Sequence, residues 1–432
     1  MKATEIIGIT SFVLFLLVFR IFLGIQINFI HLDYEQIYLM GLENAFSGNW
    51  SFWGPDVVWS KTRLPGAMQG LLAGIPLRLT NHPYSPIVLS NLISAAGLIL
   101  LSFYAKRKFP GLSLYFLLSL FLLFPFGLFN GVVLLNTSYL IFSGAILFLA
   151  VFDLFVYRDK LYWNSSLHFF MIGFSLLFTY QLHLGWVLII PFVLVLLYLE
   201  WKRTPRKWWK PVSFLALGSI ISGLTLLPTL FTYGNVIMTN VEGNLTFKIE
   251  RTFEVFDLFA RYLGMATFDI IHTRSFSVLA SDKSIINLIL IWAVKLFTIL
   301  QFIGICISLF FIERSIEYRK TILLFFLTLI MALFLYIISN KHLEARTYIL
   351  LYPIPIWLTL FSYSYLIRYR YVKSILNSSL ILVFVASLGI GISNFNDKHS
   401  FKSVENKIQR AIEKEDPYEF AKRRKTLMDD YN

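Results

Sequence analysis

Two acidic side chains, Asp33 and Glu35, follow directly on an apolar segment at the start of the chain. A carboxylate placed where hydrocarbon gives way to water can take a proton from a hydroxyl, because the low-dielectric surroundings adjust its pKa. Aspartate is also a common N-cap, so the same acids could simply begin and solvate a helix over 34–47. The residues alone leave both interpretations open.

Basic side chains recur near predicted membrane surfaces in two separate parts of the chain. The pairs that could hold a phosphate are Lys61 with Arg63 and Lys341 with Arg346. Cations at headgroup depth suit a phosphate, and arginine can bind its oxygens with two parallel hydrogen bonds. Attraction to ordinary lipid headgroups explains the first pair equally well. In the second pair, Glu344 could form a surface ion pair with either neighbour.

Polar residues also border the short turns that we expect on the same side as Asp33. They are Asn136, Gln181, His183 and His342. An amide or an imidazole there could hydrogen-bond a ligand hydroxyl. An Asn-Thr-Ser run at the start of an apolar segment is also a typical helix cap, and a single histidine at an interface is more often structural.

Two charges, Arg20 and Lys295, lie well inside apolar segments. Charge at membrane depth is costly and normally faces a cavity or a partner. These side chains could hold a lipid carrier or join helices, and the sequence does not separate the two roles.

The composition is that of a membrane protein. Of 432 residues, 57% are hydrophobic and only 15% are charged, with 38 basic against 25 acidic side chains. The basic residues cluster in short stretches between apolar runs, which is typical of cytoplasmic loops and argues against a nucleic-acid partner. A single cysteine, Cys306, excludes a disulfide framework and a cysteine metal site.

Apolar runs of membrane-spanning length predict an all-α integral membrane protein with about eleven transmembrane helices. The runs are 5–27, 84–105, 111–129, 136–157, 165–181, 184–200, 211–232, 285–312, 321–339, 347–367 and 374–395. The first run lacks a small-residue cleavage site, so we expect a retained helix rather than a signal peptide. We therefore predict one membrane domain over 1–395 and a charged tail over 396–432.

The segment 64–80 decides the topology. If it does not cross the membrane, the basic clusters at 106–108, 158–160, 202–210, 314–320 and 368–373 all face the cytoplasm. We therefore expect 64–80 to lie at the outer interface, within an outer loop over 28–83. A second outer loop is expected over 233–284. In the tail, Val404, Ile408, Ala411 and Ile412 form an apolar stripe that predicts a surface helix.

The order of these signals resembles the membrane-embedded GT-C glycosyltransferases, especially the protein O-mannosyltransferase and aminoarabinose transferase branch. The motifs are Asp33-Tyr34-Glu35, Ser47-Gly48-Asn49-Trp50, Lys61-Thr62-Arg63-Leu64-Pro65-Gly66 and Arg346-Thr347-Tyr348-Ile349-Leu350-Leu351-Tyr352-Pro353. Those enzymes typically read Asp-Glu, Gly-Asp-Trp and Lys-Pro-Pro in one loop and Arg-Tyr-x-Leu-Pro later. The resemblance covers roughly 1–200 and 335–365.

The resemblance implies an inverting transfer of a sugar from a polyprenyl-phosphate carrier to an acceptor hydroxyl on a lipid, glycan or protein. Asp33 would deprotonate the acceptor and Glu35 would position it. Lys61, Arg63, Lys341 and Arg346 would bind the donor phosphate, with Asn136, Gln181, His183, His342 and Tyr348 contacting substrate. No metal or other cofactor is assigned, since a single short acidic motif gives no basis for one. The expected location is a bacterial cytoplasmic membrane, with the site facing outward.

Two alternatives remain. An O-antigen polymerase or ligase also has about a dozen spans, but relies on arginines or histidines of its outer loops. A transporter or flippase of lipid-linked saccharides would use Arg20 and Lys295 along a substrate path, although the sequence shows no internal repeat.

Overall fold

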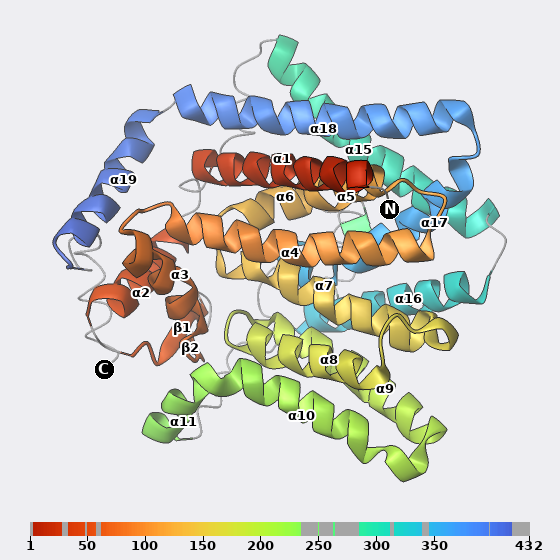
Figure 1. The fold of residues 1–432 in the computed structure, drawn as a ribbon, viewed down its shortest axis with the longest axis horizontal. Coiled ribbons are helices and arrows are strands. Elements are labelled where there is room, and N and C mark those ends of the chain that lie inside the picture. Colours follow the sequence, from red (N-terminus) through yellow and green to blue (C-terminus); the bar gives the residue numbers. More distant parts are fainter. Residues whose placement is uncertain are drawn as a thin grey trace.

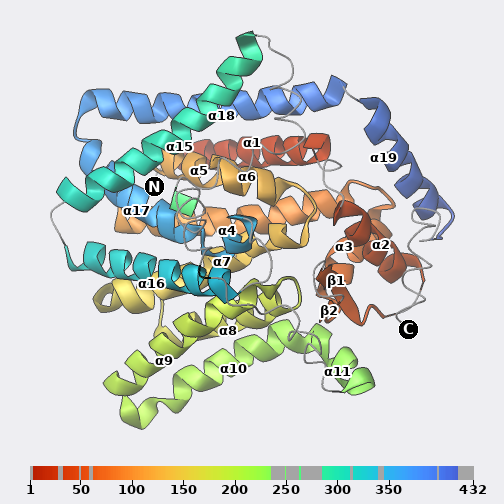
Figure 2. The same cartoon turned by 180° about the vertical axis from the view of Figure 1, so that it is seen from behind.

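The structure is a computed structural model that describes residues 3–27, 33–47, 50–57, 62–234, 249, 262–263, 285–311, 315–338, 345–396 and 398–416. Its long helices run roughly side by side in a bundle, and α2, α3 and α19 gather at one end (Figures 1 and 2). The bounds of the helices are α1 Ala3–Ile27, α2 Asp33–Phe46, α3 Met68–Thr80, α4 Ser85–Lys108, α5 Leu114–Leu123, α6 Pro125–Val132, α7 Leu140–Val151, α8 Ser165–Tyr180, α9 Ile190–Arg203, α10 Trp209–Gly223, α11 Leu227–Tyr233, α15 Ile285–Phe311, α16 Ile316–Ile338, α17 Pro353–Leu366, α18 Arg370–Asn396 and α19 Lys398–Glu413.

Short turns and two strands complete the described part. They are β1 Trp53–Val57, β2 Thr62–Pro65, η2 Asn136–Tyr139, η3 Phe152–Val156, η4 Arg158–Lys160, η5 Leu184–Ile189, η6 Pro205–Lys207, η7 Leu224–Leu226 and η10 Ala345–Leu351. Among the described residues, eight helices are long and apolar enough to cross a membrane, or up to nine if one bent pair counts as a span. The prediction of an all-α membrane protein is therefore confirmed, whereas the count of about eleven spans is not.

The predicted run 111–129 is not one straight helix. It divides into α5 and α6, which meet at an angle of 58°. Pro125 lacks an N–H and its ring excludes the preceding residue from helical geometry, so Phe124 adopts a ψ of 130°. A predicted span thus becomes a broken one, and the carbonyl groups at the end of α5 need other partners.

The helices α8 and α10 cross at close range. Gly173 on α8 faces the backbone carbonyl of Leu215, and Gly218 on α10 faces that of Phe170, so that a Cβ at either glycine would overlap the neighbouring backbone. Ser219 also donates a hydrogen bond of 3.1 Å to the carbonyl of Gly173. Small residues allow such close approach, which supplies the packing that joins helices in an apolar surrounding.

The first loop folds as a helix pair with a small hairpin. Gly41 of α2 packs on Ala73 of α3, and the Tyr38 hydroxyl donates a hydrogen bond of 2.6 Å to the carbonyl of Pro83. The strands β1 and β2 pair antiparallel, with Asp56 opposite Arg63. The expected helix over 64–80 begins only at Met68, because residues 62–65 form β2. With 13 residues, α3 is about 20 Å long and too short to cross a hydrocarbon core of about 30 Å.

The tail helix predicted from its apolar stripe is present as α19, and it is not a free surface helix. Ile408, Ala411 and Ile412 are buried, and α19 packs against α2. Burial and a hydrogen bond to Glu405 raise the pKa of the Tyr84 hydroxyl beside this contact. In Figures 1 and 2, α19 turns away from α18 and covers the end of the bundle that holds α2 and α3.

We expect Gly173→Ala to lower the free energy of unfolding by about 1–3 kcal/mol, because its new methyl group would force the backbones of α8 and α10 apart. Gly111→Ala is the matched control, since no atom lies within 4 Å of the Cβ position at Gly111. Reversible unfolding in mixed detergent micelles measures both variants. Equal stability of the two would show that the α8–α10 crossing is looser than the structure has it.

Candidate functional site

The candidate catalytic acids lie at the start of α2. Asp33 is the first residue of this helix, shortly after the end of α1 at Ile27, but its side chain lies outside the described part. Glu35 is exposed, whereas its neighbour Tyr34 is only 5% exposed. Burial, together with the negative charge of Glu35 and a hydrogen bond to it, raises the pKa of Tyr34 to about 12. The Glu35 carboxylate therefore remains open to solvent while contacting a buried hydroxyl.

The hairpin that carries Arg63 is seated on the amide side chain of Gln181. This amide donates to the carbonyl of Ser222 at 2.8 Å and accepts from the hydroxyl of Thr225 at 2.7 Å. Gly66, at the end of β2, packs on it with a φ of 105°, a conformation that favours glycine. Any other side chain at Gly66 would overlap the amide, so the fit between hairpin and Gln181 is specific.

Thr225 and Thr229, near the start of α11, hold the backbone on either side of the hairpin, before β1 and after β2. The hydroxyl of Thr229 donates a hydrogen bond of 2.6 Å to the carbonyl of Phe52. The backbone N–H of Ala67 donates one of 3.3 Å to the carbonyl of Thr225. The position of Arg63 is therefore determined by α8, α10 and α11, which are more than a hundred residues away in sequence.

Two further predicted residues lie next to Gln181. Asn136 donates a hydrogen bond of 3.0 Å to the carbonyl of Leu182, and its own carbonyl accepts the N–H of Thr137 at 2.9 Å. The Nδ1 atom of His183 accepts the N–H of Gly185 at 2.9 Å and caps η5. The contact of His183 is that of a helix cap, as the structural interpretation expected, whereas Asn136 joins η2 to the turn after α8 and Leu135 is the N-cap of η2.

The late motif reaches the same neighbourhood. The turn η10 packs against η5 and α7. Tyr348 is buried, with its hydroxyl 3.4 Å from the carbonyl of Ala332, and the Tyr352 hydroxyl donates to the carbonyl of Ile141 at 3.2 Å. Arg346 belongs to η10, but its side chain lies outside the described part.

The structure thus brings one group of predicted residues together at one end of the bundle. Glu35, Arg63, Asn136, Gln181, His183 and Tyr348 belong to elements linked by direct contacts, through α2, the hairpin, η2, the turn after α8 and η10. Lys61, Lys341 and His342 lie outside the described residues. Within the described part, no group of three His, Cys, Asp or Glu side chains is placed to hold a metal ion.

The buried Arg20 joins helices. Its guanidinium is fully buried and donates to the carbonyl of Leu122 at 2.8 Å and to the hydroxyl of Ser94 at 3.1 Å. Leu122 lies at the end of α5, where the break at Phe124 leaves carbonyl groups without helical partners. Lys295 is half-buried and lies 4.9 Å from the ring centroid of Trp292 on the same helix. Of the two roles left open for Arg20, these contacts support joining helices.

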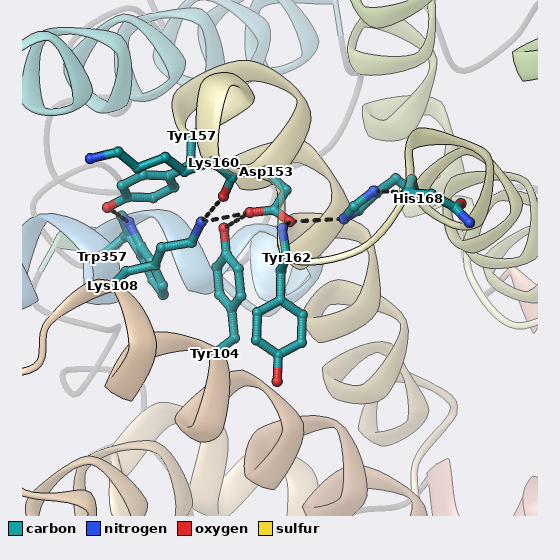
Figure 3. A network of polar contacts seen from close by, with 9 residues as sticks. Tyr104, Lys108, Asp153, Tyr157, Lys160, Tyr162, His168 and Trp357 are labelled. Carbon is teal, nitrogen blue, oxygen red and sulfur yellow. Dashed lines mark hydrogen bonds and ion pairs between the residues drawn. The ribbon is translucent and has the colours of Figure 1, made fainter.

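A second polar cluster, which the sequence analysis did not find, lies at the opposite end of the bundle (Figure 3). Its centre is the buried carboxylate of Asp153, in the π-helical turn η3. Tyr104 donates to it at 2.6 Å, the Lys108 ammonium lies at 2.9 Å, and the Nε2 atom of His168 at 3.0 Å. The N–H of Tyr162 also donates to it. The sequence feature that could have indicated this cluster is Asp153 itself, a lone acid inside the predicted apolar run 136–157.

The cluster around Asp153 acts as a junction between helices. It connects α4, η3, the turn at 161–164 and α8, and the Lys108 ammonium also donates to the carbonyl of Lys160 at 2.9 Å. Trp357 of α17 stacks on Phe152 at 4.4 Å and on Tyr104 at 5.4 Å between ring centroids. Both carboxylate oxygens already bind two donors each, so Asp153 is held in place rather than presented to a substrate.

We expect Asp153→Asn to lower the free energy of unfolding by roughly 3–5 kcal/mol, because Lys108 would lose the carboxylate that neutralises it in a buried setting. Asp159→Asn, at an exposed neighbouring acid, is the matched control and should change little. Unfolding in mixed micelles measures both variants. An Asp153→Asn protein as stable as wild type would contradict the role of Asp153 in joining these helices.

We expect Glu35→Gln to lower the pKa of Tyr34 from about 12 toward its ordinary value of 10.0, with burial keeping it above that value. Absorbance titration against a Tyr34→Phe derivative of each protein isolates this one hydroxyl, and Glu43→Gln is the control. Because folding raises the pKa, the stability from neutral Tyr34 is complete below pH 10 and is lost as the pH approaches 12. An unchanged titration in Glu35→Gln would show that Glu35 does not face Tyr34.

Comparison with known proteins assigns neither a family nor a function to the chain. The chain matches no protein-family model, no curated protein and no solved structure. Its function is therefore argued from the residues and their arrangement alone, with the end of the bundle formed by α2, the hairpin, η5 and η10 as the candidate site.

Proposed function

We propose that this protein is an integral membrane glycosyltransferase of the GT-C type, which uses a sugar carried on a polyprenyl phosphate. One observation supports it most: the loop that opens with Asp33 forms a compact unit of α2, the hairpin and α3 whose strands are docked on α8, α10 and α11. A catalytic loop of this kind needs rigid support, because general base and phosphate ligands must be held within about 0.5 Å of their working positions.

In the proposed reaction, Asp33 takes the proton of an acceptor hydroxyl. The acceptor oxygen attacks the anomeric carbon from the side opposite the phosphate, so that the new glycosidic bond forms as the carbon–oxygen bond to the phosphate breaks, with inversion. Glu35, exposed beside Asp33, positions the acceptor. Lys61, Arg63, Lys341 and Arg346 stabilise the departing polyprenyl phosphate, in the manner of cations aimed at developing charge.

The remaining predicted residues have supporting roles in this proposal. Gln181 holds the hairpin, and Asn136 and His183 shape the turns beneath it. His342 and Tyr348 would contact the substrate in this proposal. The acceptor is a hydroxyl of a lipid, a glycan or a protein.

The distribution of basic residues favours one orientation of the protein in the membrane. The basic clusters at the ends of α4, α9 and α17 and at the starts of α10, α16 and α18 lie at the end of the bundle opposite the hairpin. The excess of Lys and Arg in short loops marks the cytoplasmic side. The hairpin end would then face outward from a bacterial cytoplasmic membrane, where polyprenyl-linked sugars are used.

The test compares wild-type protein with Asp33→Asn in nanodiscs supplied with radiolabelled polyprenyl-phosphate sugars. Release of sugar from the carrier should fall by roughly 10²–10⁴-fold in the variant, which is the usual contribution of a general base. Binding of the carrier should be unchanged, since the substitution leaves the basic residues in place.

Glu43→Gln, at an acid further along the same helix, is the matched control and should retain activity. Sugar release that survives Asp33→Asn would contradict the proposed base and favour a polymerase or ligase that relies on loop arginines or histidines. If folded wild-type protein consumes no carrier, and Lys295 variants instead abolish movement of a lipid-linked saccharide, a transporter would be the better description.

A further inference from the structure

A short segment across the junction of α9 and α10, residues 201–210, carries three tryptophans and five cations. The cations are Lys202, Arg203, Arg206, Lys207 and Lys210, and all are exposed. The tryptophans Trp201, Trp208 and Trp209 are 53%, 50% and 56% exposed. We call these ten residues the Trp-basic segment. It contains no acid, and the nearest acid in sequence is Glu200, within the last turn of α9.

The connection between two candidate spans places the Trp-basic segment at the membrane surface. Its residues occur at the ends of two candidate spans, Leu184–Arg203 and Pro205–Tyr233, with Thr204 alone between them. So short a connection leaves no loop that could carry the cations away from the bilayer. Exposed tryptophan is the side chain most typical of the headgroup level, because its ring is apolar and its N–H is polar.

Three basic residues elsewhere at this end of the bundle have partners within the protein. Lys106 donates to the carbonyls of Pro110 and Leu112, at 2.7 and 2.8 Å. Lys108 binds Asp153, and Arg158 forms an ion pair with Glu200. That pair also neutralises the acid closest in sequence to the Trp-basic segment.

The five cations of the Trp-basic segment differ from these. Among the described residues, no carboxylate forms an ion pair with any of them, and Lys210 lies 5.7 Å from the ring centroid of Trp209. A cluster of five unneutralised cations repels itself and is stabilised by a multivalent anionic surface.

The apolar surface next to the segment specifies the kind of partner. Leu194 and Tyr198 on α9 and Leu217 on α10 are exposed within the spans that lead to it. A phospholipid fits both parts, with its phosphate on the cations and its acyl chains on the apolar side chains. A soluble acidic protein or nucleic acid would contact the cations alone.

We propose that the Trp-basic segment is a binding site for anionic phospholipid headgroups. It would anchor the α8–α10 layer, which supports the hairpin, to a membrane leaflet rich in phosphatidylglycerol or a similar lipid. The proposal does not depend on the transferase activity, since it rests on charge, exposure and chain connectivity only.

The experiment replaces the five cations by glutamine and measures binding of phosphatidylglycerol and phosphatidylcholine to delipidated protein by native mass spectrometry. Each cation near an anionic surface contributes a factor of about five. Screening reduces the sum, so we expect phosphatidylglycerol to bind at least about tenfold more weakly to the variant, with phosphatidylcholine unaffected.

The control variant replaces Arg319, Lys320, Arg368, Arg370 and Lys373 by glutamine, which removes the same charge from the starts of α16 and α18 and the turn before α18, at the same end of the bundle. It should weaken phosphatidylglycerol binding less than the first variant does, because no tryptophan accompanies these cations in 314–320 or 366–373. Equal losses in the two variants, or no loss in the first, would overturn the proposal. The melting temperature in neutral detergent verifies that both variants fold.

Quenching by brominated lipid provides an independent readout. Tryptophan fluorescence of wild-type protein should be quenched more by brominated phosphatidylglycerol than by brominated phosphatidylcholine. Replacing Trp201, Trp208 and Trp209 by phenylalanine should remove that difference, while the seven other tryptophans of the ten in the chain report the rest. A difference that persists in this variant would place the anionic lipid elsewhere.

Discussion

A polar group inside an apolar bundle has to find its partners within the protein, and this constraint organises the structure. Arg20 donates to the carbonyl of Leu122 and joins α1 to the broken helix α5. Asp153 joins α4 to α8 through Lys108 and His168. Gln181 joins α8 to α10 and supports the hairpin. Each of these buried side chains adds a directional contact between helices, which apolar packing does not provide.

The two ends of the bundle use polar residues differently. At the hairpin end, buried amides and hydroxyls hold backbone segments in place, so that the exposed Glu35 is presented by a rigid support. At the opposite end, buried charges form a neutral junction around Asp153, and the exposed charges of the Trp-basic segment have no such neutralisation. Chemistry on a water-borne group suits the first end, and contact with an anionic surface suits the second.

The distinction between holding and reacting residues follows from burial. A buried amide such as Gln181, with its donor and acceptor groups already bonded to protein, would leave unsatisfied partners if it turned toward a substrate. A solvent-facing carboxylate has no such cost. Among the predicted site residues that the structure describes, Glu35 is exposed, whereas the hydrogen bonds of Gln181 and Asn136 position turns of the chain.

The sequence by itself determined the helices, because apolar runs of sufficient length leave the backbone no other way to satisfy its hydrogen bonds. It also placed a helix in the tail through the stripe that includes Ile408 and Ala411. Only the tertiary structure decided the rest. The packing of Gly66 on Gln181 and the hydrogen bond from Tyr104 to Asp153 join residues far apart in the chain. Local patterns record which side chains must be buried, but they carry no information on which distant partner will satisfy them.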